Sequence, residues 1–166
     1  HNLKVLITLL SPEQVCAYWP FRNEPDLRAL MTDSSMESIV WGVPVIGESS
    51  ENTMRFHRWS PACRMKENRF GISEPEWFDQ HQIIPSDRTL ICAPALTATK
   101  AGARLGYGGG YYDRFFDTHP SVIKCAIIYD EFFDIPFIVD KHDRAVEWIV
   151  TSRRIVRVAD LLQIMP

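Results

Sequence analysis

Apolar residues occur along this chain in short runs separated by polar, proline-containing segments. The runs at residues 15–19, 38–46, 89–93, 122–129 and 147–151 are of strand length. Continuous apolar runs of this kind are typical of strands buried on both faces of a sheet. Residues 54–59 instead alternate apolar and polar side chains, which predicts a half-exposed strand with His57 on the surface.

Between the strands, other segments predict helices. Helices are expected over residues 3–10, over residues 26–31, from about Tyr111 onwards, and within residues 155–164 after a short edge strand. Residues 63–85 carry prolines, a glycine and several charges, and we expect them to be irregular. Strands that alternate with helices indicate an α/β fold. We expect a three-layer sandwich around a mostly parallel, open sheet, with residues 1–166 in a single domain.

Composition excludes some classes of protein. The net charge of −3 offers no general basic field for nucleic acid, and no apolar run approaches the roughly 18 residues of a membrane span. The four cysteines are widely spaced and form no C-x-x-C pair, so we expect reduced, structural thiols in a cytoplasmic protein. We expect a monomer. The apolar sequence of residues 3–10 resembles the second half of an amphipathic helix. We therefore expect the chain to be a fragment of a longer protein.

Four of the eight glycines lie in the run RLGYGGGYYDR, which spans residues 104–114. The run follows a predicted buried strand and leads into a predicted helix, where backbone N–H groups and the helix N-terminus suit phosphate oxygens. Lys100 and Arg104 add positive charge before the loop, and Asp113 follows it. The spacing matches neither a Walker A loop nor a dinucleotide fingerprint. A tight turn without a ligand is the alternative reading.

The text PALTATKAGARLGYGGGYYDRF around this loop resembles the signature of the 5-formyltetrahydrofolate cyclo-ligase family, also called methenyltetrahydrofolate synthetases. Three further blocks, PFRNEPDLRAL, RFGISEP and HDRAVEWIVT, resemble family segments and occur in the family's order. The resemblance implies an ATP- and Mg²⁺-dependent conversion of 5-formyltetrahydrofolate, a reduced folate, to 5,10-methenyltetrahydrofolate with release of ADP and phosphate. It implies a small-molecule substrate, and no nucleic-acid or membrane partner.

The resemblance also implies binding residues. The segment matching the nucleotide site comprises Arg104, Leu105, Gly106, Tyr107, Gly108, Gly109, Gly110, Tyr111 and Tyr112. Positions matching folate contacts are Phe21, Asp26 with Glu24 as the alternative acid, Phe70, and the loop residues Tyr107, Gly108, Gly109, Gly110 and Tyr111. Phe70 and Tyr112 have core packing as their alternative, and Phe115 and Phe116 are expected in the core. Arg22 or Arg69 could meet the anionic glutamyl tail.

Asp113 and Glu147 match the magnesium ligands of the family. Magnesium takes one or two carboxylates together with phosphate oxygens and water, so a pair of acids is expected. Asp113 could instead only stabilise the first turn of its helix, and Glu147 could be a surface residue at the end of a strand.

Two departures from the family pattern stand out. Ala98-Thr99 replaces the family's Phe-Asp before the loop, and the basic N-terminal helix of the family is not seen in this sequence. They motivate an alternative function, a catalytically impaired paralogue that binds folate or nucleotide. A sugar-phosphate isomerase-like domain is a third possibility, which rests on analogy of fold alone.

Overall fold

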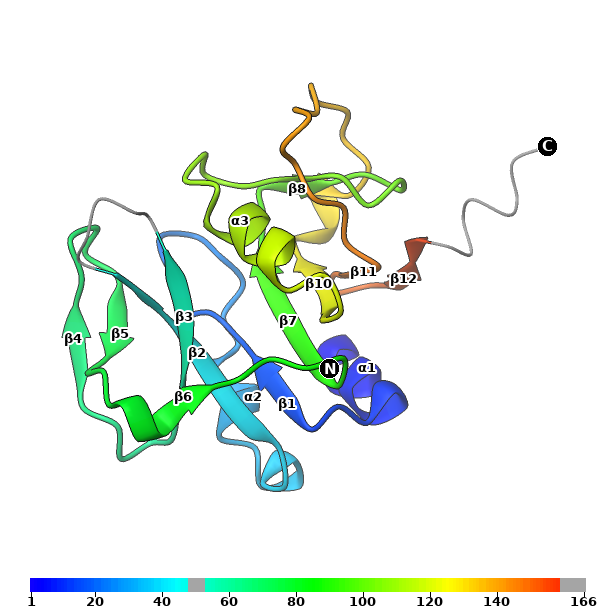
Figure 1. The fold of residues 1–166 in the computed structure, drawn as a ribbon. Coiled ribbons are helices and arrows are strands. Elements are labelled where there is room, and N and C mark those ends of the chain that lie inside the picture. The colour runs from blue at the N-terminus through cyan, green and yellow to red at the C-terminus, as the bar shows by residue number, and fades with distance from the viewer. Residues whose placement is uncertain (48–52, 159–166) are drawn as a thin grey trace.

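The computed structural model describes residues 1–47 and 53–158 of the chain (Figure 1). Its α-helices are α1 (Asn2–Leu10), α2 (Arg28–Met31) and α3 (Tyr111–Thr118), and its 3-10 helices are η1 (Ser34–Met36), η2 (Asp79–His81) and η3 (Asp130–Phe132). Its strands are β1 (Gln14–Cys16), β2 (Val40–Ile46), β3 (Met54–Arg58), β4 (Met65–Glu67), β5 (Ser73–Pro75), β6 (Gln82–Ile83), β7 (Thr89–Pro94), β8 (Thr97–Ala98), β9 (Arg104–Leu105), β10 (Ile123–Ile127), β11 (Trp148–Val150) and β12 (Ile155–Arg157).

One large sheet organises the described residues, with the strand order β12-β11-β10-β7-β1-β2-β3-β6. Neighbours from β11 to β2 pair in parallel, while β12 at one edge and β3 and β6 at the other pair antiparallel. In the centre, Val15 of β1 lies between Trp41 of β2 and Leu90 of β7. The predicted α/β fold around a mostly parallel sheet is confirmed.

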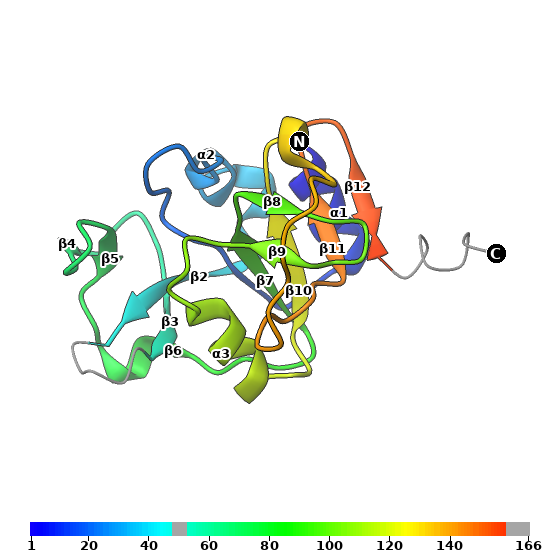
Figure 2. The same cartoon turned by 90° about the horizontal axis from the view of Figure 1, so that it is seen from above.

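Each face of the sheet has its own core because side chains alternate along a strand. On β7, Leu90 and Cys92 pack on the face covered by α1 and α2, whereas Ile91 and Ala93 pack on the face covered by α3. Figure 2 shows α1 and α3 on opposite sides of the sheet. The helices contribute the buried side chains of Leu3, Leu6 and Ile7 from α1, and of Phe115 and Phe116 from α3, as expected for the latter pair.

The order of the strands creates a crevice between β1 and β7. The chain passes from β1 to β2 on the α1 face, through α2, and from β7 to β10 on the opposite face, through α3. The two connections therefore diverge from neighbouring strands at their carboxyl ends. In open α/β sheets, ligands bind at this kind of switch point.

The expectation for residues 63–85 is wrong. They contain the antiparallel pair β4–β5 and the edge strand β6, which pairs with β3. These strands are two or three residues long, too short for an alternating pattern to show in the sequence. The last expected helix, within residues 155–164, lies largely outside the described residues, which include only the edge strand β12 there.

His57 is also not on the surface, because its side chain is only 1% exposed. The rings of Trp77, Phe78 and His81, which follow β5, cover it at centroid distances of 5.7, 6.4 and 5.2 Å. Burial lowers the pKa of His57, so the neutral imidazole is favoured. No pattern in residues 54–59 indicates that this later segment returns over β3.

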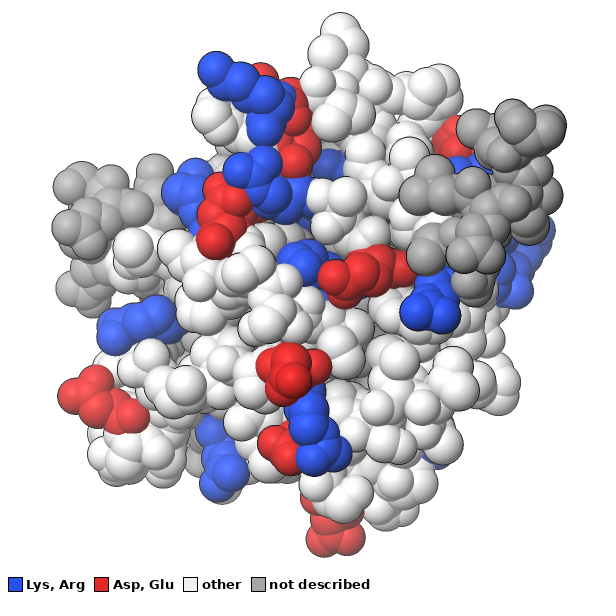
Figure 3. Space-filling view, turned by 45° about the vertical axis from the view of Figure 1, so that its right-hand side comes forward, with Lys and Arg blue, Asp and Glu red and all other residues white. Residues whose placement is uncertain are grey.

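Charged side chains in Figure 3 are mixed, with blue and red groups side by side on this face. The described residues also form ion pairs, such as Lys4–Asp33 and Arg144–Asp117. No helix within residues 1–47 and 53–158 is long and apolar enough to cross a bilayer. The expectations of a monomer and of a cytoplasmic location stay predictions.

Candidate active site

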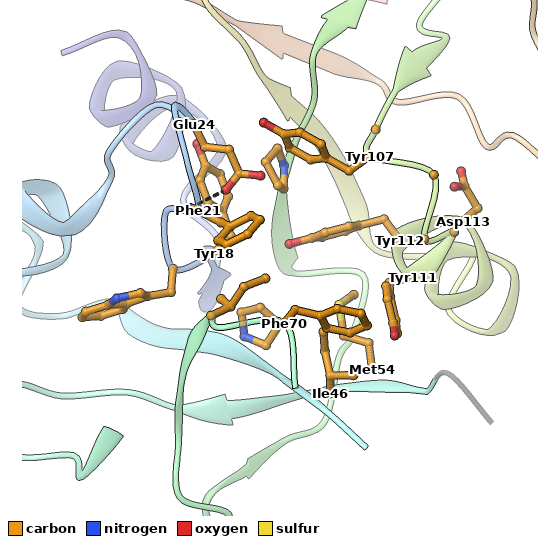
Figure 4. Close-up of a pocket in the computed structure, with 18 of the residues that line it drawn as sticks. Tyr18, Phe21, Glu24, Ile46, Met54, Phe70, Tyr107, Tyr111, Tyr112 and Asp113 are labelled. Atoms are coloured by element: carbon orange, nitrogen blue, oxygen red, sulfur yellow. Dashed lines mark hydrogen bonds between the residues drawn. The ribbon is translucent and has the colours of Figure 1, made fainter. Parts of the chain in front are cut away.

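A pocket of about 510 Å³ opens at the carboxyl ends of β1, β2 and β7, where the fold has its crevice. Tyr18 follows β1, Pro44 and Ile46 belong to the end of β2, and Pro94 ends β7. The glycine loop and the first turn of α3 form one wall, and Phe70 approaches from the segment between β4 and β5 (Figure 4). The pocket therefore joins segments that are far apart in the sequence.

The glycine loop is held between the β8–β9 pair and α3. Gly108 and Gly110 have φ angles of +85° and +64°, a left-handed conformation that disfavours any residue with a Cβ atom. At Gly109, a Cβ atom would lie 2.9 Å from the ring of Tyr111. Gly110 is the N-cap of α3 and offers no side chain to the first-turn N–H groups. These N–H groups at the pocket wall are therefore suited to an anion.

Arg104 and Asp113 form a buried ion pair beside this loop. The Arg104 Nη2 atom donates to Asp113 Oδ1 at 2.8 Å, and the two side chains are 4% and 19% exposed. Asp113 Oδ1 also accepts the backbone N–H of Arg144 at 3.0 Å. The Asp113 carboxylate thus ties the start of α3 to β9 and to the segment that leads into β11.

The opposite wall comes from the turn that follows β1. Glu24 Oε2 accepts the N–H of Phe21 at 2.9 Å, and burial raises the pKa of Glu24. The Tyr18 hydroxyl donates to the carbonyl of Pro25 at 2.6 Å. Glu24 is therefore a partly desolvated carboxyl group on a cavity that several aromatic rings line.

The structure separates the two acids proposed for this wall. Asp26, the first candidate, does not line the pocket and pairs with Arg28 at 2.7 Å at the surface. Arg28 lowers the pKa of Asp26 through a side-chain hydrogen bond. Glu24, the alternative, lines the pocket. A role for Asp26 as a direct contact stays a prediction that this geometry does not favour.

Aromatic rings line most of the cavity. Phe70 and Tyr111 meet edge to face at 6.2 Å, and Arg69 donates to the Tyr111 hydroxyl at 3.1 Å. Tyr112 extends from α3 toward Tyr18 (Figure 4), and its buried hydroxyl has no hydrogen-bond partner among the described residues. Apolar and aromatic walls with a few polar groups are typical of pockets that bind small molecules or cofactors.

Most of the predicted site residues come together here. The whole loop from Arg104 to Tyr112 lines the pocket with Phe21, Glu24, Phe70 and Asp113, whereas Asp26 and Glu147 do not. The sequence analysis missed several lining residues, among them Tyr18, Pro44, Ile46, Met54 and Asp143. A place at the carboxyl end of a predicted parallel strand was the signal that could have identified Tyr18, Pro44 and Ile46.

Glu147 lies at the start of β11, where its carboxylate accepts from the backbone N–H of Lys124 at 2.7 Å and pairs with Lys124 Nζ at 3.1 Å. Within the described part of the chain, no group of three or more His, Cys, Asp or Glu side chains could hold a metal ion. Of the two predicted magnesium ligands, Asp113 lines the pocket and Glu147 does not, so their role as a pair of ligands stays a prediction.

Comparisons with known proteins point to one family. A family model described as the 5-formyltetrahydrofolate cyclo-ligase family matches residues 3–152. The chain is similar to the 5-formyltetrahydrofolate cyclo-ligase of Haemophilus influenzae, with 31% identity over 109 residues, which cover 66% of this chain and 58% of that protein. The chain is also similar to the Mycolicibacterium smegmatis protein of the same name, with 30% identity over 157 residues, which cover 87% of this chain and 76% of that protein.

Solved structures agree on the fold. The solution structure of Aquifex aeolicus 5,10-methenyltetrahydrofolate synthetase superposes with a TM-score of 0.75 and 29% identity, over 95% of this chain and 77% of that one. A 5,10-methenyltetrahydrofolate synthetase from Mycoplasma pneumoniae superposes with a TM-score of 0.64 and 20% identity, over 89% and 80% of the chains, which supports the fold alone.

Proposed function

Because the chain belongs to the 5-formyltetrahydrofolate cyclo-ligase family, we propose that it catalyses the ATP-dependent conversion of 5-formyltetrahydrofolate to 5,10-methenyltetrahydrofolate. The products are ADP and phosphate. The observation that supports this most strongly is the composition of one pocket, in which a glycine loop at a helix N-terminus faces aromatic walls that carry the partly buried acid Glu24. A phosphate donor and a flat ring system can then lie next to each other.

The proposed reaction balances in two steps. The formyl oxygen attacks the γ-phosphorus of ATP, the bond from phosphorus to the bridging oxygen breaks, and ADP leaves. The lone pair of N10 then attacks the formyl carbon, N10 loses its proton, and phosphate departs with the former formyl oxygen. An amide-like oxygen is a poor leaving group, whereas phosphate is a good one. Catalysis of phosphoryl transfer is mainly a matter of positioning and charge stabilisation.

The pocket residues have distinct roles in this proposal. Backbone N–H groups of residues 108–111 would hold the transferring phosphoryl group, since only glycine allows the main chain to come this close. Arg104 is held by Asp113 behind the loop, so it keeps the loop in place. Tyr107, Phe70 and Tyr111 would enclose the folate rings and exclude water.

Glu24 is the acid that we place against the folate. Its Oε2 atom is held by the Phe21 N–H, which fixes the carboxyl group against the wall and leaves Oε1 for a ligand N–H group. A reduced pterin carries several N–H donors on its edge, which a carboxylate can accept. The desolvated site makes this hydrogen bond stronger than it would be in water.

Magnesium would supply charge neutralisation at the phosphates. Asp113 is the pocket carboxylate that could hold it, with phosphate oxygens and water as the remaining ligands. Glu147, the second predicted ligand, would have to give up its pairing with Lys124 to take part. Its role as a ligand stays a prediction.

A spectrophotometric assay tests the proposal. The purified chain should produce the near-ultraviolet absorbance of the methenyl product from 5-formyltetrahydrofolate only when ATP and Mg²⁺ are present. Binding of folate and nucleotide in calorimetry without turnover would instead support the impaired paralogue that Ala98 and Thr99 motivate. Absence of both turnover and binding would refute the proposal.

Two neighbouring acids give a matched pair of variants for this assay. Glu24→Gln should raise the KM for folate about tenfold, as expected when a hydrogen bond to a charged group is weakened in a desolvated site. Asp26→Asn should have little effect on KM, because Asp26 lies outside the pocket and pairs with Arg28. The reverse order of effects would contradict the assignment of Glu24.

A further inference from the structure

Two cations line the pocket, and they differ in their partners. Arg104 is buried and neutralised by Asp113 at 2.8 Å. Arg22 is exposed and makes no ion pair with any residue that the structure describes within 1–47 and 53–158. The neighbouring acid Glu24 accepts the Phe21 N–H, and burial raises the pKa of Glu24. Arg22 therefore contributes a positive charge to the pocket that no described side chain cancels.

The Arg22 side chain lies against two aromatic rings at the edge of the pocket. Its guanidinium carbon is 5.0 Å from the ring centroid of Phe21 and 5.6 Å from that of Tyr107 in the glycine loop. Contacts of this kind between a guanidinium and ring faces leave the N–H groups in the guanidinium plane able to reach a ligand. The cation is thus held beside the glycine loop.

The backbone at Arg22 is unfavourable for an arginine. Its φ angle is +55°, in the left-handed region, where a residue with a Cβ atom carries a cost of about 1–2 kcal/mol. The next residue, Asn23, belongs to a type that tolerates this conformation better, so the turn could have placed its positive φ there at lower cost. Strain of this kind tends to persist where it serves a functional geometry.

From these observations we propose that Arg22 is a binding residue for an oxyanion at the mouth of the pocket. The anion is a phosphate group of the nucleotide or a carboxylate of the folate's glutamyl tail, both of which a guanidinium recognises through charged hydrogen bonds. The identity of the anion rests on the proposed function, whereas the presence of an oxyanion site does not. Although the net charge of the protein is negative, Arg22 would then place a positive charge where the anionic ligand binds.

Arg22→Gly separates binding from folding. Glycine adopts a positive φ freely, so the variant should keep or raise the thermal midpoint, by up to about 4 °C, while it loses the cation. Affinity for the recognised anion should fall about tenfold and depend less on salt concentration. Arg22→Lys, which keeps the charge, should retain part of the affinity. Arg157→Ala on the edge strand β12 removes the same charge far from the pocket and is the control.

Four ligands distinguish the sources of the anion in calorimetry. Inorganic tripolyphosphate probes oxyanion binding without any assumption about the reaction. A non-hydrolysable ATP analogue tests the phosphate source, and 5-formyltetrahydrofolate compared with a 5-formyltetrahydropterin that lacks the glutamyl tail tests the carboxylate source. A loss in Arg22→Gly with tripolyphosphate or the nucleotide, or with the tailed folate alone, supports the proposal. Equal affinities of the wild type and Arg22→Gly for all of these ligands would overturn it.

Failure of the proposed function would give a different calorimetric result from failure of the Arg22 proposal. In that case the wild type would bind neither the nucleotide nor the folate, and only the tripolyphosphate comparison would decide on Arg22. If the wild type failed to bind tripolyphosphate as well, both proposals would be wrong. An Arg22→Gly protein that loses stability together with affinity would assign Arg22 a structural role and also overturn the inference.

Discussion

The ion pair between Arg104 and Asp113 gives the most demanding test of this structure. Asp113→Asn keeps an oxygen that can accept from Arg104 Nη2 and from the Arg144 N–H, but it removes the negative charge from both hydrogen bonds. A hydrogen bond to a charged group contributes about 1.5–3 kcal/mol and a neutral one about 0.5–1.5 kcal/mol. With two bonds weakened, the free energy of unfolding should fall by about 2–3 kcal/mol.

Urea unfolding followed by fluorescence measures this loss without any ligand. In a chain of this length, 1 kcal/mol corresponds to about 2–4 °C in the thermal midpoint, so a drop of about 4–12 °C is expected. The guanidinium of Arg104, which is 4% exposed, would be left without a counter-charge in Asp113→Asn. Adding Arg104→Met to that variant removes the unpaired charge and should recover much of the stability, because an apolar replacement of a buried pair is often neutral.

The same cycle decides how to interpret activity. If Asp113→Asn abolishes turnover, the cause could be lost magnesium or a displaced glycine loop, and magnesium titration in the presence of a nucleotide separates the two. An Asp113→Asn protein whose unfolding free energy lies within about 0.5 kcal/mol of the wild type would refute the structural role of the pair. Asp113 would then be free to act mainly as a metal ligand.

Three further predictions follow from the pKa shifts. The Thr151 hydroxyl and then Arg154 lower the pKa of Asp130, so its contribution to stability is present above the usual pKa and is lost as the pH falls through the lowered one. In urea titrations below about pH 4, the unfolding free energy of Asp130→Asn should therefore fall less steeply with pH than that of the wild type. Parallel profiles would contradict this. Burial raises the pKa of Glu24, and a raised carboxyl pKa has the opposite effect on stability. Stability falls as the pH rises from the usual pKa of the carboxyl group to the raised one, so Glu24→Gln should be more stable than the wild type at pH 7. A urea midpoint equal to or lower than that of the wild type would count against this prediction. Burial raises the pKa of the Cys92 thiol to about 12, which disfavours the reactive thiolate. An aromatic disulfide reagent should therefore modify the partly exposed Cys63 in the native protein. The buried thiols of Cys16, Cys92 and Cys125 should react only on unfolding.

The parts of the fold that the sequence predicted are those in which local pattern and tertiary role agree. Residues 89–93 form a largely apolar run because β7 is buried on both faces. The run can be recognised directly in the amino-acid sequence. The glycine loop was also predictable, since glycine at positive φ and at close approach leaves a compositional trace. Both features depend on residues that are adjacent in sequence.

The parts that were missed depend on long-range packing. His57 is buried because the segment after β5 folds back over β3, and nothing within residues 54–59 encodes that return. The choice between Asp26 and Glu24 depended on the direction of a single turn, which places Glu24 toward the pocket and leaves Asp26 to pair with Arg28. A shift of two residues along a turn is beyond what spacing alone can resolve.

The walls of the pocket have a consequence for how the protein behaves without its ligands. Apart from Asp143, the lining residues lie in three parts of the chain, which are residues 18–24, residues 44–46 with 54 and 68–73, and residues 94 and 104–113. These parts meet through a few side chains, such as Arg22 on Tyr107 and Arg69 on the Tyr111 hydroxyl. A molecule that fills the space adds contacts to all three parts at once, and its binding free energy becomes stability of the native state. Starvation for substrate would therefore leave more copies open to proteolysis, and the cellular level of the protein would follow the supply of what it binds.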